Sequence, residues 1–406
     1  MAEKMIIGGE NHRCDQEISK SESESREWTL FLPVDMVINI LSRLSVELLP
    51  SCRRVCKCWC EIIDSPPFLK KSQLVVLKHY GHQQSLLYSL KLDLSNNVLI
   101  SSERRIAGFA NSYVRLVSNY LGYGLFLFKN NSCVEEAFLY NPIKGEVLML
   151  PRATSTSTSY TPTMLDTIRK SYGLGFDSTT NQYKLVYVCD VGKWKGTHMD
   201  ISLVTKVLTL GSSEWRQISD VPPCCIGKDS VAVPASEVIH WKPLKSKGMI
   251  VSFDVRKEKF RVTPLPHSLL RQYELFSWRE TLALTDVSSS TDHLEIWVLK
   301  DYDNERWAKE YRISTYRSWR DSPPFCGAWE DGMIFIYANE FYYYDLKTDG
   351  VTPMYQPRWC SYRWDGKMMS YSINLQLSLK NYGDLVKNSA TQSQEGDYFD
   401  LGRSTR

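Results

Sequence analysis

A unit of strand, turn and strand recurs along most of the chain and constrains the fold more than any other feature of the sequence. Each unit has an apolar or aromatic strand, a turn marked by Asp, Asn or Gly, and a second strand, as in FLYNPIKGEVLMLP. The turn residues are Asp93, Asn141, Gly211, Asp254, Asp301 and Asp345. The units are therefore 48, 70, 43, 47 and 44 residues apart. Four of these five steps match the roughly 40–50 residues of a propeller blade.

Such a unit predicts a small antiparallel sheet, which cannot bury its apolar face alone. Radial packing of repeated sheets removes this problem. We therefore predict an all-β, propeller-like domain of about six or seven blades over residues 74–380, and the period disfavours the alternative, a β-sandwich. The long step contains the Ser/Thr-rich segment 153–163, predicted to be an inserted loop, and a hairpin whose turn spans 177–181.

The segment from Trp28 to Leu69 has a helical pattern instead. After Pro33, which suits a first helical turn, the apolar residues Val37, Ile40, Leu41 and Leu44 share one face of a predicted helix. A second predicted helix ends before Ser65, and its apolar residues at helical spacing are Leu49, Cys52, Val55, Cys56, Trp59, Ile62 and Ile63. A segment this short can hardly bury both stripes by itself, so its surplus apolar face is predicted to bind a partner.

The ends and the composition indicate where such a chain works. Residues 1–27 and 387–406 are polar and aperiodic, which predicts a disordered leader and tail. Eleven scattered cysteines, and no apolar run of signal-peptide length after Met1, indicate the reducing cytoplasm and/or nucleus. A net charge of +3 is too small to predict nucleic-acid binding, and no run approaches the roughly 20 apolar residues that cross a membrane.

The helical segment resembles the F-box. Its hallmarks are a Leu-Pro opening, an Ile-Leu-Arg-Leu-like first helix and a Val-Cys-Lys-x-Trp second helix, which correspond here to Leu32-Pro33, residues 40–44 and residues 55–59. The blocks FLYNPIKGEVLMLP, YGLGFDSTTNQYKLVYV, VIHW and AWEDGMIFIY are similar, in order, to those of the plant F-box-associated domain, a kelch-like domain shared by the S-locus F-box proteins of pollen. The fold class is then mixed, with a small all-α F-box at 28–69 before the propeller-like domain.

This resemblance implies a substrate-recognition subunit of an SCF (Skp–cullin–F-box) ubiquitin ligase. Its F-box would bind a Skp-type adaptor and, through it, a cullin scaffold, while the propeller would bind an unidentified protein that is then ubiquitinated and degraded by the proteasome. The implied adaptor-facing or F-box-core residues are Leu32, Pro33, Ile40, Leu41, Leu44, Leu49, Val55, Cys56 and Trp59. A non-ligase F-box adaptor with a binding or regulatory role, and a glycan-binding receptor on the same fold, are the alternatives.

One stretch departs from the family pattern. Pro50-Ser51-Cys52 stands where the F-box usually has a Leu-x-Phe-like sequence. Because proline is tolerated at the start of a helix, we expect a shifted helix boundary and weaker adaptor binding, with the fold retained.

No sequence motif indicates catalysis or a cofactor. HExxH, a P-loop, GxSxG and GxGxxG are absent, so we expect a non-catalytic subunit without metal. Cys52, Cys56 and Cys60 could share a helical face, but ligands at i, i+4 and i+8 would span about 12 Å, too far for one zinc ion. Asp254, Asp301 and Asp345 occupy equivalent turns, which favours a turn role over a glycosidase acid pair.

Substrate binding is predicted in loops at one face of the propeller or in its central channel. The candidate loops are 153–169, 190–199, 222–230, 286–293 and 316–324. The last contains Tyr316, Trp319 and Arg320, residue types that often anchor interfaces. Gly173 and Gly175 are predicted to be turn or strand-edge glycines, and His240 a simple strand residue.

Overall fold

The computed structural model describes most of the chain between residues 33 and 388. The described ranges are 33–44, 48–64, 72–80, 84–104, 109, 113–120, 124–130, 136–153, 169–195, 198–227, 230–244, 248–266, 273–286, 293–314, 325–329, 332–337, 340–355, 367–372, 379–382 and 386–388. The predicted leader, Leu32, and the predicted tail beyond residue 388 lie outside them. Two compact units are present, Met1–Lys71 and Ser72–Arg406.

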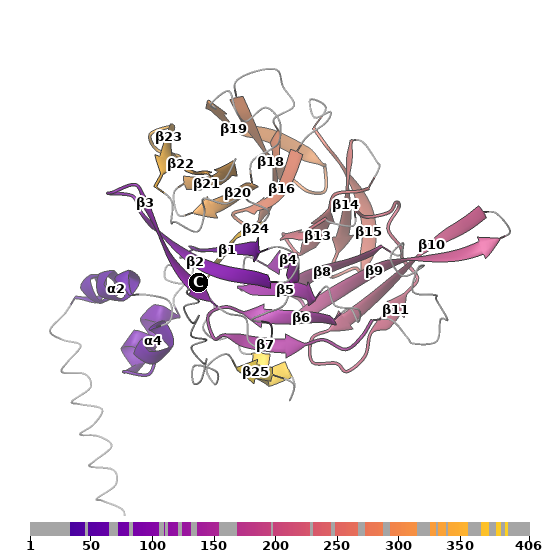
Figure 1. Cartoon of the computed structure of the whole chain (residues 1–406), viewed down its shortest axis with the longest axis horizontal. Coiled ribbons are helices and arrows are strands. Elements are labelled where there is room, and N and C mark those ends of the chain that lie inside the picture. Colours follow the sequence, from indigo (N-terminus) through magenta and orange to yellow (C-terminus); the bar gives the residue numbers. More distant parts are fainter. Residues whose placement is uncertain are drawn as a thin grey trace, which may run out of the picture. The chain divides into compact units, whose positions relative to one another are not determined.

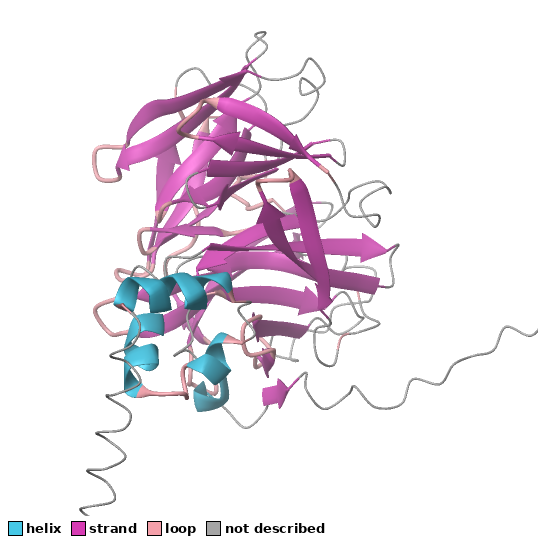
Figure 2. Ribbon diagram, turned by 90° about the vertical axis from the view of Figure 1, so that its left-hand side faces the viewer, coloured by secondary structure: helices cyan, strands magenta, loops and turns pink. Residues whose placement is uncertain are grey.

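The described part of the first unit is helical (Figure 2). It contains α2 (Val34–Arg43), α3 (Leu49–Cys52) and α4 (Lys57–Ile63). The single helix predicted after Leu49 is wrong, because the chain is extended at Cys56, with φ −158° and ψ 167°. The Cys56 thiol accepts a hydrogen bond from the Trp59 N–H at 3.4 Å and so caps the start of α4. Pro50 lies in the first turn of α3, where proline is tolerated.

A small core and one ion pair hold these helices together. Val37, Leu41, Leu49 and Ile63 are buried between them. Arg53, just after α3, donates two-pronged hydrogen bonds to Asp64 at the end of α4, with an Nη2–Oδ2 distance of 2.7 Å. This contact fixes the ends of α3 and α4 to each other.

The second unit is a β-propeller of antiparallel sheets (Figure 1). The sheets, written from the inner strand outward, are: β24 (Lys367–Ser372), β1 (Ser72–Tyr80), β2 (Gln84–Asp93) and β3 (Val98–Arg104); β4 (Val114–Tyr120), β5 (Leu125–Asn130), β6 (Glu136–Asn141), β7 (Glu146–Met149) and β25 (Val386–Asn388); β8 (Lys170–Asp177), β9 (Gln182–Lys195), β10 (His198–Thr209) and β11 (Arg216–Ile218); β12 (Val233–Ala235), β13 (Val238–Trp241), β14 (Met249–Asp254) and β15 (Lys259–Pro264); β16 (Tyr273–Trp278), β17 (Thr281–Asp286), β18 (His293–Asp301) and β19 (Arg306–Ser314); β20 (Phe325–Trp329), β21 (Gly332–Tyr337), β22 (Glu340–Asp345) and β23 (Gly350–Met354).

The inner strands form a closed ring. Each of β24, β4, β8, β12, β16 and β20 contacts the next, and β20 contacts β24. Within the described residues, five sheets are regular four-stranded blades and the remaining sheet has five strands. The predicted count of about six or seven blades is therefore wrong for the regular blades, of which the described residues form five; the five-stranded sheet completes the ring.

Three C-terminal segments complete the propeller. Strand β24 pairs with β1 along Ser72–Leu77, which joins the end of the domain to its beginning. The 3₁₀ helix η4 (Leu379–Tyr382) then places the fully buried Leu379 in a core cluster with residues of the β4–β7 and β8–β11 strands. Finally β25 pairs with β7 (Figure 1), so residues 387–388 form a strand where the sequence predicted disorder.

The six predicted turn residues occupy one equivalent place. Each lies where the third strand of its sheet, counted from the inner strand, leads into the fourth. The side-chain oxygens of Asn141, Asp254, Asp301 and Asp345 accept hydrogen bonds from backbone N–H groups two residues on, at 2.8–3.1 Å. The predicted turn role of the three aspartates is therefore confirmed, because such hydrogen bonds shape Asx turns.

A second residue marks the same turns. In five of them the residue four places after the Asp or Asn has a positive φ of 53–64°: Asn97, Gly145, Glu258, Glu305 and Asp349. The turn from Asp177 to Asn181, between β8 and β9, has the same form, with φ 54° at Asn181. The repeated turns thus share one backbone conformation, although different residue types occupy the position of positive φ.

Gly173 and Gly175 have a more specific role than that of turn or strand-edge glycines. Both lie within β8, where the neighbouring sheet approaches the backbone closely. A Cβ at Gly173 would lie 2.5 Å from Trp241 Cζ2, and one at Gly175 would lie 2.5 Å from Val255 Cγ2. Because glycine has no Cβ, β8 can pack closely against the β12–β15 sheet.

Candidate functional site

Exposed apolar side chains gather in the F-box-like unit. Nine large apolar residues are exposed in the described chain, and five of them fall between residues 33 and 64. These five are Val34, Met36, Ile40, Leu48 and Val55, with exposed fractions of 46–63%. A small unit with this much exposed apolar surface is suited to binding a protein partner.

The residues that the sequence assigned to the adaptor-facing or core set differ in their exposure to solvent. Leu41 and Leu49 are buried, at 0% and 1% exposure, and belong to the core. Ile40 and Val55 are exposed, at 46% and 63%. Pro33 is also exposed, Leu44, Cys56 and Trp59 are half-buried, and Leu32 lies outside the described residues.

Three exposed apolar residues of this unit were not among those predicted from the sequence: Val34, Met36 and Leu48. Met36 precedes Ile40 by one helical turn, so the spacing could have indicated it. Leu48 immediately precedes α3, outside the helical periodicity, and gave no such signal. The candidate adaptor surface therefore comprises Val34, Met36, Ile40, Leu48 and Val55.

Among the described residues of this unit, Cys52, Cys56, Cys58 and Cys60 are free thiols. Burial, followed by the nearby Cys56, raises the pKa of the Cys58 thiol, and burial, followed by Asp64, raises that of Cys60. A raised thiol pKa favours the protonated form, which binds zinc poorly. No group of three or more His, Cys, Asp or Glu side chains suited to a metal occurs in the described ranges.

The strand order divides the propeller into two ends. Because successive strands are antiparallel, the inner-to-second and third-to-outer connections share one end of each sheet, here called the turn end. The second-to-third connections, and those leading to the next sheet, share the opposite end, here called the loop end. A parallel bridge between Ser118 before the end of β4 and Ala232 next to β12 agrees with inner strands that run in one direction.

All five candidate substrate loops belong to the loop end. Loops 153–169, 222–230 and 316–324 lead into inner strands, whereas 190–199 and 286–293 include connections between second and third strands. Tyr316, Trp319 and Arg320 lie outside the described residues, as do most of three of these loops. The shared end follows from topology alone, and the role of these loops stays a prediction.

The described part of the loop end includes a long hairpin. β9 pairs with β10 up to Lys195 and His198, whereas β8 reaches only Cys189. The six residue pairs from Asp190–Leu203 to Lys195–His198 therefore extend beyond the partner strand β8, over roughly 20 Å. Figure 1 shows this hairpin reaching away from the rest of the propeller.

A backbone hydrogen bond joins two inner strands that are not neighbours in the ring. The Ala232 N–H donates a hydrogen bond to the Val117 carbonyl at 2.8 Å, although their strands, β12 and β4, lie on either side of β8 in the ring. Ser118 beside them is fully buried and accepts a hydrogen bond from the Leu174 N–H at 3.2 Å.

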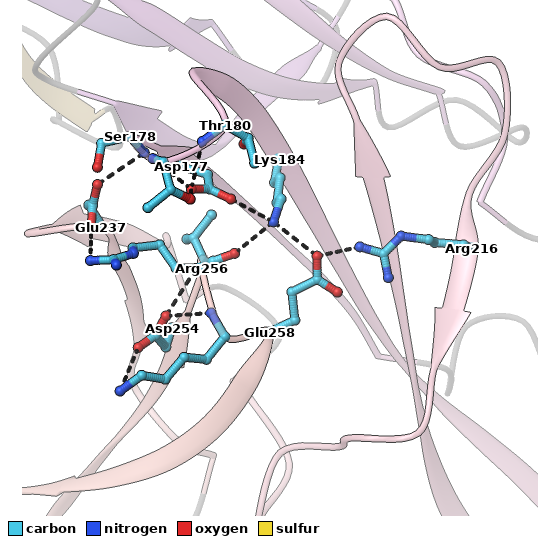
Figure 3. A network of polar contacts seen from close by, with 12 residues as sticks. Asp177, Ser178, Thr180, Lys184, Arg216, Glu237, Asp254, Arg256 and Glu258 are labelled. Atoms are coloured by element: carbon cyan, nitrogen blue, oxygen red, sulfur yellow. Dashed lines mark hydrogen bonds and ion pairs between the residues drawn. The ribbon is translucent and has the colours of Figure 1, made fainter.

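A polar network at the turn end joins two blades (Figure 3). Lys184 Nζ lies 2.9 Å from Asp177 Oδ2 within the β8–β11 sheet, and 3.1 Å from Glu258 Oε1 and from the Val255 carbonyl of the β12–β15 sheet. Arg216 binds the same Glu258 carboxylate. The Ser178 N–H donates to Glu237 at 3.0 Å and adds a second link between these sheets.

The pKa values in this network describe a stable ionic contact rather than a catalytic pair. Burial by itself would raise the pKa of Asp177, but hydrogen bonds from Thr179 and Lys184 outweigh it and hold the pKa well below its usual range. Burial would lower the pKa of Lys184, but Asp177 and Glu258 raise it instead. Asp177 and Lys184 therefore stay charged near neutral pH, and neither is poised to exchange a proton.

Comparison with known proteins identifies both parts of the chain. Residues 30–71 match the family described as the F-box domain, and residues 73–354 match the one described as the F-box associated beta propeller domain. The chain belongs to the F-box proteins that carry this propeller. The predicted resemblance is therefore confirmed, and the described helices and sheets fall within its two parts, except for the C-terminal β24, η4 and β25.

Several proteins from Arabidopsis thaliana are similar to this F-box protein. Putative F-box protein At1g53550 is 26% identical, with 86% of this chain and 91% of the relative covered. F-box protein At5g65850 is 27% identical, with 71% and 73% covered. Among solved structures, a chain of the nidogen/laminin complex overlaps 73% of this chain and 98% of its own length, with 11% identity and a TM-score of 0.42.

Proposed function

We propose that this F-box protein is the substrate-recognition subunit of an SCF ubiquitin ligase. The observation that carries the proposal is the candidate adaptor surface, a set of exposed apolar side chains on a unit that belongs to the F-box family. A Skp-type adaptor would cover this surface, because burying an apolar side chain at an interface stabilises the complex by about 1–3 kcal/mol. The adaptor would then link the protein to a cullin.

The propeller would bind a protein substrate through its loop end. The strand framework is closed by β24 and its turns are fixed by side-chain hydrogen bonds, so it can hold variable loops in place. Ubiquitin transfer needs no catalytic group on this subunit, since the receptor contributes by bringing the substrate close to the ubiquitin-charged enzyme. The protein would act in this way in the cytoplasm and/or the nucleus.

Substitution of the exposed F-box residues tests the adaptor contact. Val55→Asp and Ile40→Asp would each place a charge in the apolar interface and weaken adaptor binding about 10-fold or more, measured by titration calorimetry with a purified Skp-type adaptor. Leu94→Asp is the matched control, because Leu94 is 42% exposed but lies in the propeller. Adaptor binding that is unchanged in both F-box variants would refute the assigned surface.

Co-purification with the cullin distinguishes the ligase from the regulatory alternative. We expect the full chain to recover adaptor and cullin together from plant extract, and Val55→Asp to recover neither. A chain that recovers adaptor without cullin would contradict the ligase proposal and favour an F-box protein that acts outside an active ligase.

A further inference from the structure

The outer edge of β10 differs from the corresponding edges of other blades. In the β12–β15 sheet the outer strand pairs with the whole third strand, Met249–Asp254, and in the β20–β23 sheet it pairs with Phe341–Asp345. In the β8–β11 sheet the third strand, β10, has 12 residues, but β11 pairs only with Thr205–Val207. The part of β10 nearer the loop end therefore has no outer strand among the described residues.

The chain after β11 does not continue this pairing. In the register of β10 with β11, Pro222 would fall opposite Ile201, and Pro222 and Pro223 have no N–H to donate. At Asp220 the chain is already attached to the next sheet, because the Asp220 carboxylate accepts a hydrogen bond from the Phe260 N–H. The outer strand therefore ends early, while β10 continues without it.

Hydrogen bonds to β9 fix the direction of the backbone groups in β10. The Leu210 N–H donates to the Tyr183 carbonyl at 2.8 Å, and the register of β9 with β10 continues from there without a shift. Even-numbered residues of β10 therefore bond to β9, and odd-numbered residues direct their N–H and C=O groups to the side of β11. Met199, Ile201 and Leu203, here called the open edge, pair with no described strand on that side.

The open edge borders a face of the hairpin that carries apolar residues. Successive residues of a strand alternate between its two faces, so Met199, Ile201 and Leu203 share the face of Val207. Val207 belongs to the core cluster shared with the β12–β15 sheet, and the partly buried Leu203 packs against that cluster. The residue of β9 opposite Met199 is Trp194. A strand added at the open edge would continue this face with its own alternate residues, and apolar residues suit it there.

An edge of this kind is a template for strand addition. Its three residues offer three N–H and three C=O groups, and an extended peptide gains affinity from such main-chain groups and specificity from its alternate side chains. The edge also belongs to the loop end, which the proposed function assigns to the substrate. A second copy of this chain is the competing occupant, and it would make the pairing depend on protein concentration.

We propose that the open edge binds an extended segment of the substrate protein, with apolar residues at alternate positions, as an additional strand of the β8–β11 sheet. This inference rests on the proposed function and specifies the kind of segment that the loop end recognises. The segment would follow the line of β11 beyond Ile218, beside the hairpin that Figure 1 shows reaching away from the rest of the propeller.

Hydrogen exchange at single amides tests the open edge in the free protein. We expect slow exchange at Asp200 and Ser202, whose N–H groups bond to β9, and fast exchange at Met199, Ile201 and Leu203. Slow exchange of these three amides at every protein concentration would show that another part of the chain covers them. Slow exchange that appears only with dimerisation would show a second copy. Either result, or fast exchange at all five amides, would overturn the proposal.

Peptides of about 12 residues, selected from a random phage-display library against the full chain with its adaptor, test the binding. We expect them to carry apolar residues at alternate positions and to slow exchange at the open edge. Ile201→Pro removes one outward N–H and no hydrogen bond to β9, so it should weaken their binding about 10-fold or more in titration calorimetry. Gln217→Pro is the matched control, because the Gln217 N–H points away from β10 at the exposed edge of β11. Equal binding to Ile201→Pro and the wild type, or a library that yields no peptide, would refute strand addition.

Two further measurements separate strand addition from other causes. Slow exchange at Asp200 and Ser202 in Ile201→Pro would show that the hairpin is intact; if it is not, Ile201→Glu keeps the N–H, places a charge on the apolar face and should weaken peptide binding to a similar extent. Adaptor and cullin should co-purify with Ile201→Pro as they do with the wild type. Absence of cullin from the wild type would contradict the ligase proposal, whereas peptide binding that ignores Ile201 would contradict strand addition alone.

Discussion

Replacement of Lys184 by Met should destabilise the propeller strongly. The Lys184 side chain is 10% exposed, and the Asp177 side chain opposite it is 2% exposed. Methionine fills a similar volume but leaves Asp177 and Glu258 without the cation between them, and it also removes the hydrogen bond to the Val255 carbonyl. Breaking a buried pair by removing one partner costs about 3–5 kcal/mol, and we expect a loss in this range.

The assay is urea unfolding of the full chain, followed by tryptophan fluorescence. Lys257→Met is the matched control, because Lys257 lies in the turn before Glu258 but is 77% exposed and 3.8 Å from Asp254. An exposed pair of this kind contributes at most about 1 kcal/mol, so the control should unfold almost as the wild type does. Equal losses in the two variants would refute the view that Lys184 joins the blades.

A double variant separates the lost contact from the unpaired charge. Asp177→Asn in the Lys184→Met background removes the buried carboxylate, while an Asn side chain can still accept the turn hydrogen bond from the Thr179 N–H. We expect the double variant to be more stable than Lys184→Met alone. A double variant that is less stable would show that packing, rather than the unpaired carboxylate, causes the loss.

Three further predictions concern single residues. Because the pKa of His240 is lowered to about 3 in the folded protein, the unfolded chain binds a proton first as pH falls. The free energy of unfolding of the wild type should therefore decrease by about 2 kcal/mol between pH 7 and pH 5. His240→Gln should lose less, and equal losses for the two proteins in urea unfolding would contradict this. Gly173→Ala should cost about 1–3 kcal/mol by collision with Trp241, whereas Gly227→Ala, which has no atom closer than 3.5 Å, should be tolerated in the same assay. Leu379→Ala should cost about 2–5 kcal/mol and speed proteolysis of the C-terminal segment, and unchanged proteolysis would argue against its anchoring role.

The repeat could be predicted because its determinants are local. An Asp or Asn side chain makes hydrogen bonds within the next three residues, so the turns at Asp254, Asp301 and Asp345 follow from short stretches of sequence. The helix break at Cys56 is also local, but helical spacing continues through it. Periodicity alone therefore merged α3 and α4.

The contacts that close and join the blades could not be predicted in the same way. Lys184 meets Val255 across 71 residues, and the Leu379 N–H donates to Glu146 Oε2 at 2.7 Å across 233 residues. No spacing rule links positions so far apart. His240 illustrates the same limit, since a strand residue in sequence becomes part of an interface only when the next blade packs on it.

The two ends of the propeller differ in what their connections can tolerate. Turn-end connections such as 177–181 and 254–258 have a fixed form, with a side-chain acceptor at the first position and a positive φ at the last, so an insertion would break both features. The connection from β7 to β8 lies at the loop end and spans residues 150–169. It contributes to the long step between Asn141 and Gly211 while the blades on either side keep their pairing. Under the proposed function, variation at the loop end would change what the protein binds without altering its turns, and this is where substrate contacts should be sought first.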